Sequence, residues 1–460
     1  MNDFVLDFSN AIALSSSDIG IEENSIFHQE ITDAYNRTLA LRDSGKYGFF
    51  DLPGKDITLI QQFTEKKLEK FDNFVVLGIG GSALGNKMLH NSLNPLYWNY
   101  FPKEKRNGFL RVFVIDNVDP ELLLGLLNTI DIKRTLFNVI TKSGTTAETM
   151  TNYLFALDTL KKELKDNFRG NVVITTDKEK GILRKYAQEN KINTFIVPDN
   201  VGGRFSVLTD VGLLSASFEG INIKRLLEGA ANMRNTFFSS FENPITIFAS
   251  IAYQLLKKYN IDETVLMPYS NHLSYFADWF VQLWAESLGK KTDRQGSVVN
   301  AGLTPIKAVG ATDQHSQIQL YNEGPKNKFL TFIRINNHRM DAKFENIEIN
   351  ELKYLEKHSI SQLLNTEQTA TADTLRENNV PNVTLSIPEL NEFNIGKLIF
   401  FFETATAFMG ELLNIDAFNQ PGVENAKNIT YALMGRKGFD DARKIYLEKK
   451  AEYPNLSIDF

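Results

Sequence analysis

Residues 74–85, FVVLGIGGSALG, decide the fold of this chain, because they place a strand, a glycine turn and the start of a helix in one short stretch. The apolar run Phe74–Leu77 predicts a strand buried on both faces, as in a parallel sheet. Four glycines between residues 78 and 85 can take positive φ and let a ligand approach the backbone closely. A glycine turn that leads into a helix leaves free N–H groups pointing at one spot, which favours a bound phosphate.

The letters GIGGSA of residues 78–83 also fit the loose dinucleotide fingerprint G-x-G-x-x-G/A. That fingerprint requires an acidic residue about 20 positions further on, at the end of a second strand. The region in question reads LNPLYWNYFPKEK, and the next strand, Arg111–Ile115, ends in Asp116, too far along. We therefore favour a phosphate or sugar phosphate over NAD, and a tight turn without a ligand remains the alternative.

Composition excludes several classes of protein. The 460 residues predict two or more domains, and 43% apolar residues indicate a folded chain. A net charge of −6 argues against a nucleic-acid partner. The absence of cysteine excludes disulfides and thiolate sites and suits the cytoplasm. The N-terminal residues do not form a secretory signal, no run is long enough for a membrane span, and the six scattered histidines suggest no metal site.

From Phe74 onward, short apolar runs alternate with helical stretches, which predicts an α/β fold with a doubly wound parallel sheet of the flavodoxin-like kind. Ligands of such sheets lie at the carboxyl ends of the strands. The expected strands are Phe74–Leu77, Leu110–Ile115, Leu136–Ile140, Asn171–Thr175 and Asn193–Val197, with helices at Glu148–Leu164 and Lys180–Glu189.

A second unit of similar build begins near Phe218. Its expected elements are a helix at Pro244–Tyr259, a strand at Glu263–Pro268, a helix near Leu273–Leu288, strands at Lys328–Ile335 and Asn382–Ile387, and a helical segment at Ser359–Asn379. We divide the chain into an N-terminal arm with helices (1–60), two α/β domains (61–215 and 216–394) and a C-terminal helical segment (395–460).

Residues 141–149, TKSGTTAET, form a second candidate anion site, since they follow one expected strand and precede a helix. Five hydroxyl groups and a lysine in nine positions can cradle a phosphate together with the helix dipole. Thr145-x-x-Glu148 also fits a capping box, which would set the start of the helix. An ordinary hydroxyl-capped helix is the alternative for this segment taken alone.

Two later segments carry groups suited to proton transfer. In VGGRFSVL (201–208), Arg204 follows two glycines and could stabilise a developing oxyanion, although an arginine capping a turn is the alternative. In QLWAESLGK (282–290), Gln282 and Glu286 share one helical face among bulky apolar neighbours. Burial there would raise the pKa of Glu286 and suit it to act as a base, whereas a glutamate on a polar stripe is the alternative.

Two further segments add one titratable group each. TDQHSQIQ (312–319) surrounds His315 with amides, and histidine is suited to moving a proton at neutral pH, unless it is simply a hydrogen-bonded structural residue. QPGVENAK (420–427) opens a helix on which Lys427 shares a face with apolar residues. The alternatives for Lys427 are a snorkelling side chain and a pair with Glu424.

These segments, in this order, resemble the phosphoglucose isomerase (glucose-6-phosphate isomerase) family over roughly residues 25–435. GIGGSALG and TKSGTTAET resemble the two phosphate loops of the family's sugar-isomerase domains, and VGGRFSVLTDVGLL resembles a family signature. QLWAESLGK, DQHSQIQL and QPGVENAK resemble its catalytic glutamate, histidine and lysine segments. The second loop departs from the SKTFTT of many members, and the length resembles the shorter bacterial form.

The resemblance implies a role for each matching residue. Glu286 would move a proton between C1 and C2, and Arg204 would stabilise the enediolate. His315, from the partner subunit, and Lys427 would assist ring opening. Gln282 and Gln420 would flank the substrate, and the phosphate would be held by Gly81, Ser82, Thr141, Lys142, Ser143 and Thr146.

The activity implied is aldose–ketose isomerisation of glucose 6-phosphate and fructose 6-phosphate in glycolysis and gluconeogenesis, by a cytoplasmic homodimer or higher homo-oligomer without a metal or cofactor. This chemistry needs a phosphate anchor, one base and positive charge near the enediolate, all of which the segments supply. Two rivals stay open: a non-catalytic regulator that binds sugar phosphates, and a related isomerase acting on mannose 6-phosphate or an amino sugar.

Overall fold

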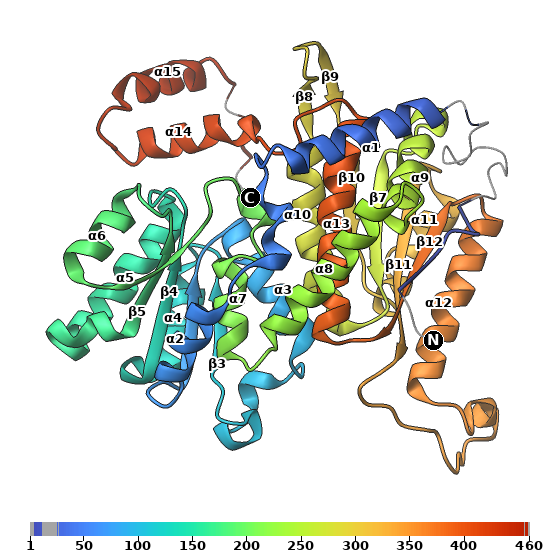
Figure 1. The fold of residues 1–460 in the computed structure, drawn as a ribbon, viewed down its shortest axis with the longest axis horizontal. Coiled ribbons are helices and arrows are strands. Elements are labelled where there is room, and N and C mark those ends of the chain that lie inside the picture. Colours follow the sequence, from blue (N-terminus) through green and yellow to red (C-terminus); the bar gives the residue numbers. More distant parts are fainter. Residues whose placement is uncertain (1–3, 12–24, 26, 455, 459–460) are drawn as a thin grey trace.

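The computed structural model describes residues 4–11, 25, 27–454 and 456–458, and it contains two five-stranded sheets with helices on their faces (Figure 1). The first sheet confirms the expected strands to within one or two residues. Its strands are β2 (Asn73–Leu77), β3 (Arg111–Ile115), β4 (Thr135–Ile140), β5 (Val172–Thr176) and β6 (Asn193–Ile196).

All strands of the first sheet are parallel, in the order β3-β2-β4-β5-β6. This is the doubly wound, flavodoxin-like order, in which the chain reverses its direction of travel beside the first strand. The carboxyl ends of β2 and β4 are therefore neighbours. The glycine segment after β2 and the hydroxyl-rich segment after β4 consequently leave the sheet at the same edge, at the switch point where such folds bind ligands.

The second sheet has the order β1-β12-β11-β7-β10, and it is parallel except at one edge. Strand β1 of the N-terminal arm pairs antiparallel with β12, whereas the other four strands are parallel. Those four repeat the connectivity of the first sheet. The sheet consists of β1 (Val5–Asp7), β7 (Glu263–Pro268), β10 (Thr304–Lys307), β11 (Lys328–Asn337) and β12 (Asn382–Glu389).

Sequence patterning missed β10 and the hairpin of β8 (Lys290–Thr292) and β9 (Val298–Ala301), because these strands are short and largely exposed. Three- and four-residue strands with polar residues give no clear alternation. The hairpin projects from the top of the molecule in Figure 1.

Helices surround and separate the two sheets, and the expected ones are present. Some begin at clear signals: Asn243 accepts hydrogen bonds from the N–H groups of Ile245 and Thr246, with Pro244 in the first turn of α9. Helix α13 crosses the middle of the molecule and is buried over nearly its whole length. The α-helices before it are α1 (His28–Asp43), α2 (Thr58–Leu68), α3 (Leu84–Leu93), α4 (Pro120–Thr129), α5 (Ala147–Leu164), α6 (Ile182–Asn190), α7 (Asp210–Phe218), α8 (Ile223–Ser239), α9 (Pro244–Tyr259), α10 (Ser274–Leu288), α11 (Ile318–Glu323) and α12 (Ile360–Glu377), with α13 at Glu392–Leu412.

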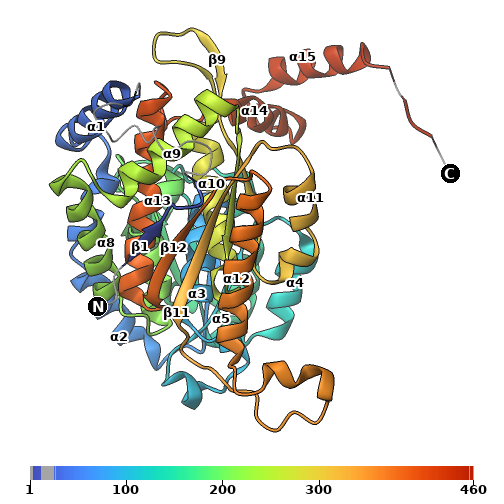
Figure 2. The same ribbon diagram turned by 90° about the vertical axis from the view of Figure 1, so that its right-hand side faces the viewer.

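The last two helices, α14 (Glu424–Leu433) and α15 (Asp440–Ala451), lie outside this core. Figure 1 shows α14 above the first sheet's helices, and Figure 2 shows α15 standing away from the body. Within the described residues, none of the helices has the length and apolar character needed to cross a bilayer. The division into four segments stays a prediction, although β1 ties the N-terminal arm to the second sheet.

Candidate active site

The glycine segment after β2 packs tightly against two other parts of the chain. A Cβ on Gly81 would lie 2.2 Å from the carbonyl carbon of Gly203, so only glycine allows this contact between the two loops. A Cβ on Gly80 would lie 2.9 Å from Nε2 of Gln282 on α10. The first loop thus touches both the segment that carries Arg204 and the helix that carries Glu286.

The hydroxyl-rich segment after β4 gathers its side chains at one point. The hydroxyls of Thr141 and Thr146 are 2.9 Å apart, and Ser143 Oγ accepts hydrogen bonds from the N–H and the hydroxyl of Thr145 at 3.2 Å. The expected capping box is wrong: α5 begins at Ala147 after Thr146, and neither side chain of the proposed box caps it. Thr145 turns instead to Ser143, which leaves the helix N–H groups open to a ligand.

Lys142 connects this second loop to the loop that carries Arg204. Its ammonium group donates to the carbonyl of Asp199 at 2.6 Å and to that of Val201 at 3.3 Å. The three segments that sequence analysis singled out in the first α/β unit therefore converge in space, with Ser82 at the end of the short 3-10 helix, residues 80–82, that precedes α3.

Arg204 is the centre of the hydrogen-bonding network, and its side chain is only 2% exposed. Its guanidinium group joins α10 to the loop that precedes α14, so that residues far apart in sequence are held together. Burial lowers the pKa of Arg204, while the nearby Glu286 carboxylate opposes that shift. The acceptors of its hydrogen bonds are Ser287 Oγ, Glu286 Oε2, Gln420 Oε1 and the carbonyl oxygens of Ala417 and Asn419.

Glu286 and Gln282 lie one turn apart on α10 and face each other, as their spacing predicted. Gln282 Nε2 donates to Glu286 Oε1 at 3.0 Å, and Arg204 Nη1 lies 3.5 Å from Glu286 Oε2. The Glu286 side chain is 32% exposed, so its apolar neighbours do not enclose it as we expected. Both oxygens are oriented by donors, while one side of the group remains open to a substrate.

His315 and Lys427 are not joined to this cluster by any interaction among the described residues. His315 is exposed at the end of a short 3-10 helix, residues 312–315. Lys427 lies on α14, is 48% exposed and pairs with Glu424 at 2.9 Å, which was one of the alternatives. The single chain thus assembles the base, the arginine and the two glutamines, but not the histidine or the lysine.

The comparison with known proteins decides the family. Residues 61–444 match the family model described as Phosphoglucose isomerase. The chain belongs to the phosphoglucose isomerase family. It is 43% identical over 456 residues to the glucose-6-phosphate isomerase of Carboxydothermus hydrogenoformans, covering 97% of this chain and 98% of that protein. It is 35% identical over 433 residues to that of Methanocaldococcus jannaschii, covering 93% and 98%.

Solved structures give the same result for the fold. A hypothetical protein of Thermus thermophilus superimposes with a TM-score of 0.84 and 34% identity, covering 94% of this chain and all of that one. A glucose-6-phosphate isomerase of Chlamydia trachomatis superimposes with a TM-score of 0.72 and 25% identity, covering 86% and 76%. The two-unit α/β architecture is thus that of phosphoglucose isomerases.

Sequence reasoning missed two residues that adjoin this phosphoglucose isomerase site. Tyr431, one turn beyond Lys427 on α14, donates from its hydroxyl to the carbonyl of Thr145 at 3.0 Å. Lys290 donates to the backbone carbonyl of Glu286 at 2.5 Å, and burial, with the charge of Arg204, lowers its pKa to about 8. The sequence signal that could have found them is the i, i+4 spacing of Tyr431 from Lys427 and of Lys290 from Glu286.

Proposed function

We propose that this chain interconverts glucose 6-phosphate and fructose 6-phosphate, with Glu286 as the base and Arg204 as the group that stabilises the enediolate. The observation that supports this proposal is the single hydrogen-bonded cluster of Arg204, Glu286, Gln282 and Gln420 beside two phosphate-type loops. The family assignment sets the reaction, and the cluster supplies groups in the number and kind that the reaction needs.

Proton transfer requires one carboxylate that can reach two adjacent carbons. In the open-chain aldose, Glu286 takes the proton from C2; the C2–H electrons form the C1=C2 bond, and the carbonyl electrons move to O1. As the ketose forms, the hydroxyl proton of O2 passes to O1, the C2=O bond forms, and the protonated carboxyl group of Glu286 returns its proton to C1. Gln282 holds one carboxylate oxygen, which limits the rotation of the group and keeps the other oxygen near the substrate.

The positive charge of Arg204 stabilises the negative charge that develops on the enediolate. Its guanidinium group is fixed by its other acceptors before the substrate arrives, so it does not have to reorganise during the reaction. Its burial keeps water from screening the charge. Gln420, held by Arg204, presents its amide nitrogen as a further donor for a sugar hydroxyl.

The phosphate group would anchor the sugar at the switch point of the first sheet. We assign this contact to the backbone around Gly81 and to the hydroxyls of the two loops, in keeping with their convergence. Lys142 adds positive charge while it holds the loops together. The residues of this phosphate site are Gly81, Ser82, Thr141, Lys142, Ser143 and Thr146.

Ring opening needs a proton donor and acceptor that the single chain does not place beside Glu286. We propose that His315 of a second copy enters the site and that Lys427 approaches it when α14 moves. The exposure of both side chains is consistent with such roles. A homodimer would therefore be the active form, and the absence of cysteine suits the cytoplasm as its compartment.

A coupled assay tests this function. The purified protein is incubated with fructose 6-phosphate and EDTA, and glucose 6-phosphate is followed through a dehydrogenase. Rapid turnover is expected. Tight binding of the sugar phosphate without turnover would favour the regulator, and neither binding nor turnover would refute the proposal.

A further inference from the structure

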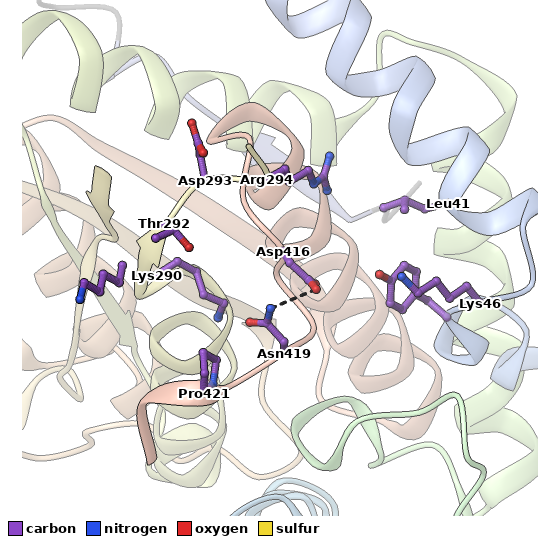
Figure 3. A pocket seen from close by; sticks show the side chains of 11 residues that line it. Leu41, Lys46, Lys290, Thr292, Asp293, Arg294, Asp416, Asn419 and Pro421 are labelled. Atoms are coloured by element: carbon purple, nitrogen blue, oxygen red, sulfur yellow. Dashed lines mark hydrogen bonds between the residues drawn. The ribbon is translucent and has the colours of Figure 1, made fainter. Parts of the chain in front are cut away.

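A cavity of about 490 Å³ (Figure 3) adjoins the catalytic cluster, since its lining includes Lys290, which bonds to the backbone of Glu286, and the two residues on either side of Gln420. It is formed by the end of α1 and the turn after it, the start of the β8–β9 hairpin and the loop that leads to α14. Cavities of about 300–1,000 Å³ hold small ligands. The charged residues that line this one are Lys46, Lys290, Lys291, Asp293, Arg294 and Asp416.

The two acids of the cavity are already engaged with the backbone around them. Asp293 accepts from the N–H groups of Gln295 and Ser297, and Asp416 accepts from the N–H of Phe418. Both carboxylates therefore accept hydrogen bonds from the turns that follow them in the chain. Asp416 also accepts from the amide of Asn419, the hydrogen bond drawn in Figure 3.

Of the four cations, Lys46 and Lys290 share the longer-range attraction of the Asp416 carboxylate. Arg294 pairs with the buried carboxylate of Glu411. Within the part of the chain that the structure describes, Lys46, Lys290 and Lys291 form no ion pair within 4.0 Å. Apart from the Arg294–Glu411 pair, the lining thus combines three positive charges with two negative ones, and an anion would offset the excess.

Among the residues of the lining, Lys290 provides the strongest argument for a bound anion. Its side chain enters the cavity in Figure 3, and the residue is only 7% exposed. Its hydrogen bond to the backbone carbonyl of Glu286 uses one of the three ammonium protons, which leaves two for other acceptors. A buried ammonium group is costly, and the attraction of the Asp416 and Glu286 carboxylates offsets only part of that cost, so a bound anion would offset more of it.

We propose that this cavity binds a small dianion, carrying a phosphate or two or more carboxylates, and that the bound anion inhibits the isomerase. The binding stands on the cavity and its charges, whereas the inhibition rests on the proposed function. Two features would link the cavity to the catalytic cluster. Lys290 donates a hydrogen bond to the backbone carbonyl of Glu286, and Asn419, which lines the cavity, directly precedes Gln420, the residue that accepts from Arg204. Added negative charge beside Arg204 would also oppose the charge of the enediolate.

Calorimetry tests the binding with the catalytic site already filled. The protein is saturated with fructose 6-phosphate and titrated with inorganic phosphate in one arm and citrate in the other. Binding of at least one probe is expected, and it should weaken about tenfold in the double variant Lys46→Glu, Lys291→Glu. The matched control is Lys66→Glu, Lys224→Glu, which reverses two exposed charges elsewhere and should bind like the original chain.

The results separate this site from the catalytic one. No binding of either probe to the saturated protein, or equal affinity in both double variants, would overturn the site. In turnover assays the bound probe should lower kcat at saturating fructose 6-phosphate, and only in chains that keep Lys46 and Lys291. Inhibition that excess fructose 6-phosphate fully relieves would overturn the inhibitory role.

Discussion

Replacing Arg204 by lysine keeps the positive charge of the active site but removes the planar fork of donors. Arg204 serves five acceptors, and a lysine ammonium group can serve three at most, so at least two acceptors lose their donor. If the two are the buried acceptors, Ser287 Oγ and the carbonyl of Ala417, each loss costs about 1–3 kcal/mol, which gives about 2–6 kcal/mol of folding free energy. In a chain of this length that corresponds to a fall in Tm of about 2–6 °C.

The catalytic effect of Arg204→Lys should be larger than its effect on stability. The loss of one preorganised donor to a developing oxyanion lowers kcat by about 100- to 1,000-fold. We would measure kcat in the coupled assay and Tm by calorimetry, with Arg225→Lys on the exposed face of α8 as the control. A variant that loses stability but keeps kcat within a few-fold would refute the role of Arg204 at the enediolate and leave it a structural residue.

Three further changes test other parts of the site. Glu286→Gln should lower turnover by at least about 1,000-fold while calorimetry still detects fructose 6-phosphate, since the amide keeps the shape but cannot take the proton; substantial turnover would contradict this. Tyr431→Phe removes the hydrogen bond to Thr145 and should lower kcat/KM about two- to tenfold, whereas the exposed Tyr453→Phe should not. Glu403 is fully buried with no hydrogen-bond partner among the described residues, so burial raises its pKa well above 4.5. The stability that its protonation provides is complete below about pH 4.5 and is lost as the pH rises towards and through the folded-state pKa. Glu403→Gln should therefore gain Tm relative to the original chain between pH 5 and pH 8, and a constant difference would contradict the buried acid.

Local sequence determined much of the fold. The apolar runs before residues 78 and 141 became strands, and the segments after them became loops that lead into helices, because strand and helix periodicity are properties of neighbouring residues. The spacing of Gln282 and Glu286 likewise placed them on one helical face. The roles of these residues came from the resemblance to a family, since each motif alone had an ordinary structural alternative.

Local pattern was less reliable where two interactions competed. Thr145-x-x-Glu148 has the letters of a capping box, yet the hydroxyl and N–H of Thr145 bond to Ser143 instead. The apolar neighbours of Glu286 suggested burial, but they face the core while the carboxylate faces the open side of α10. A pattern of letters specifies which bonds are possible, and packing selects among them.

Only the tertiary structure decided which distant segments meet. The pairing of β1 with β12, the contact of Gly81 with Gly203 and the reach of Arg204 to Gln420 each join residues far apart along the chain. The charged cavity that adjoins the site is likewise built from three separate segments. Such contacts form because burying the whole chain at once is favourable, and that free energy depends on the complete packing and not on any short stretch.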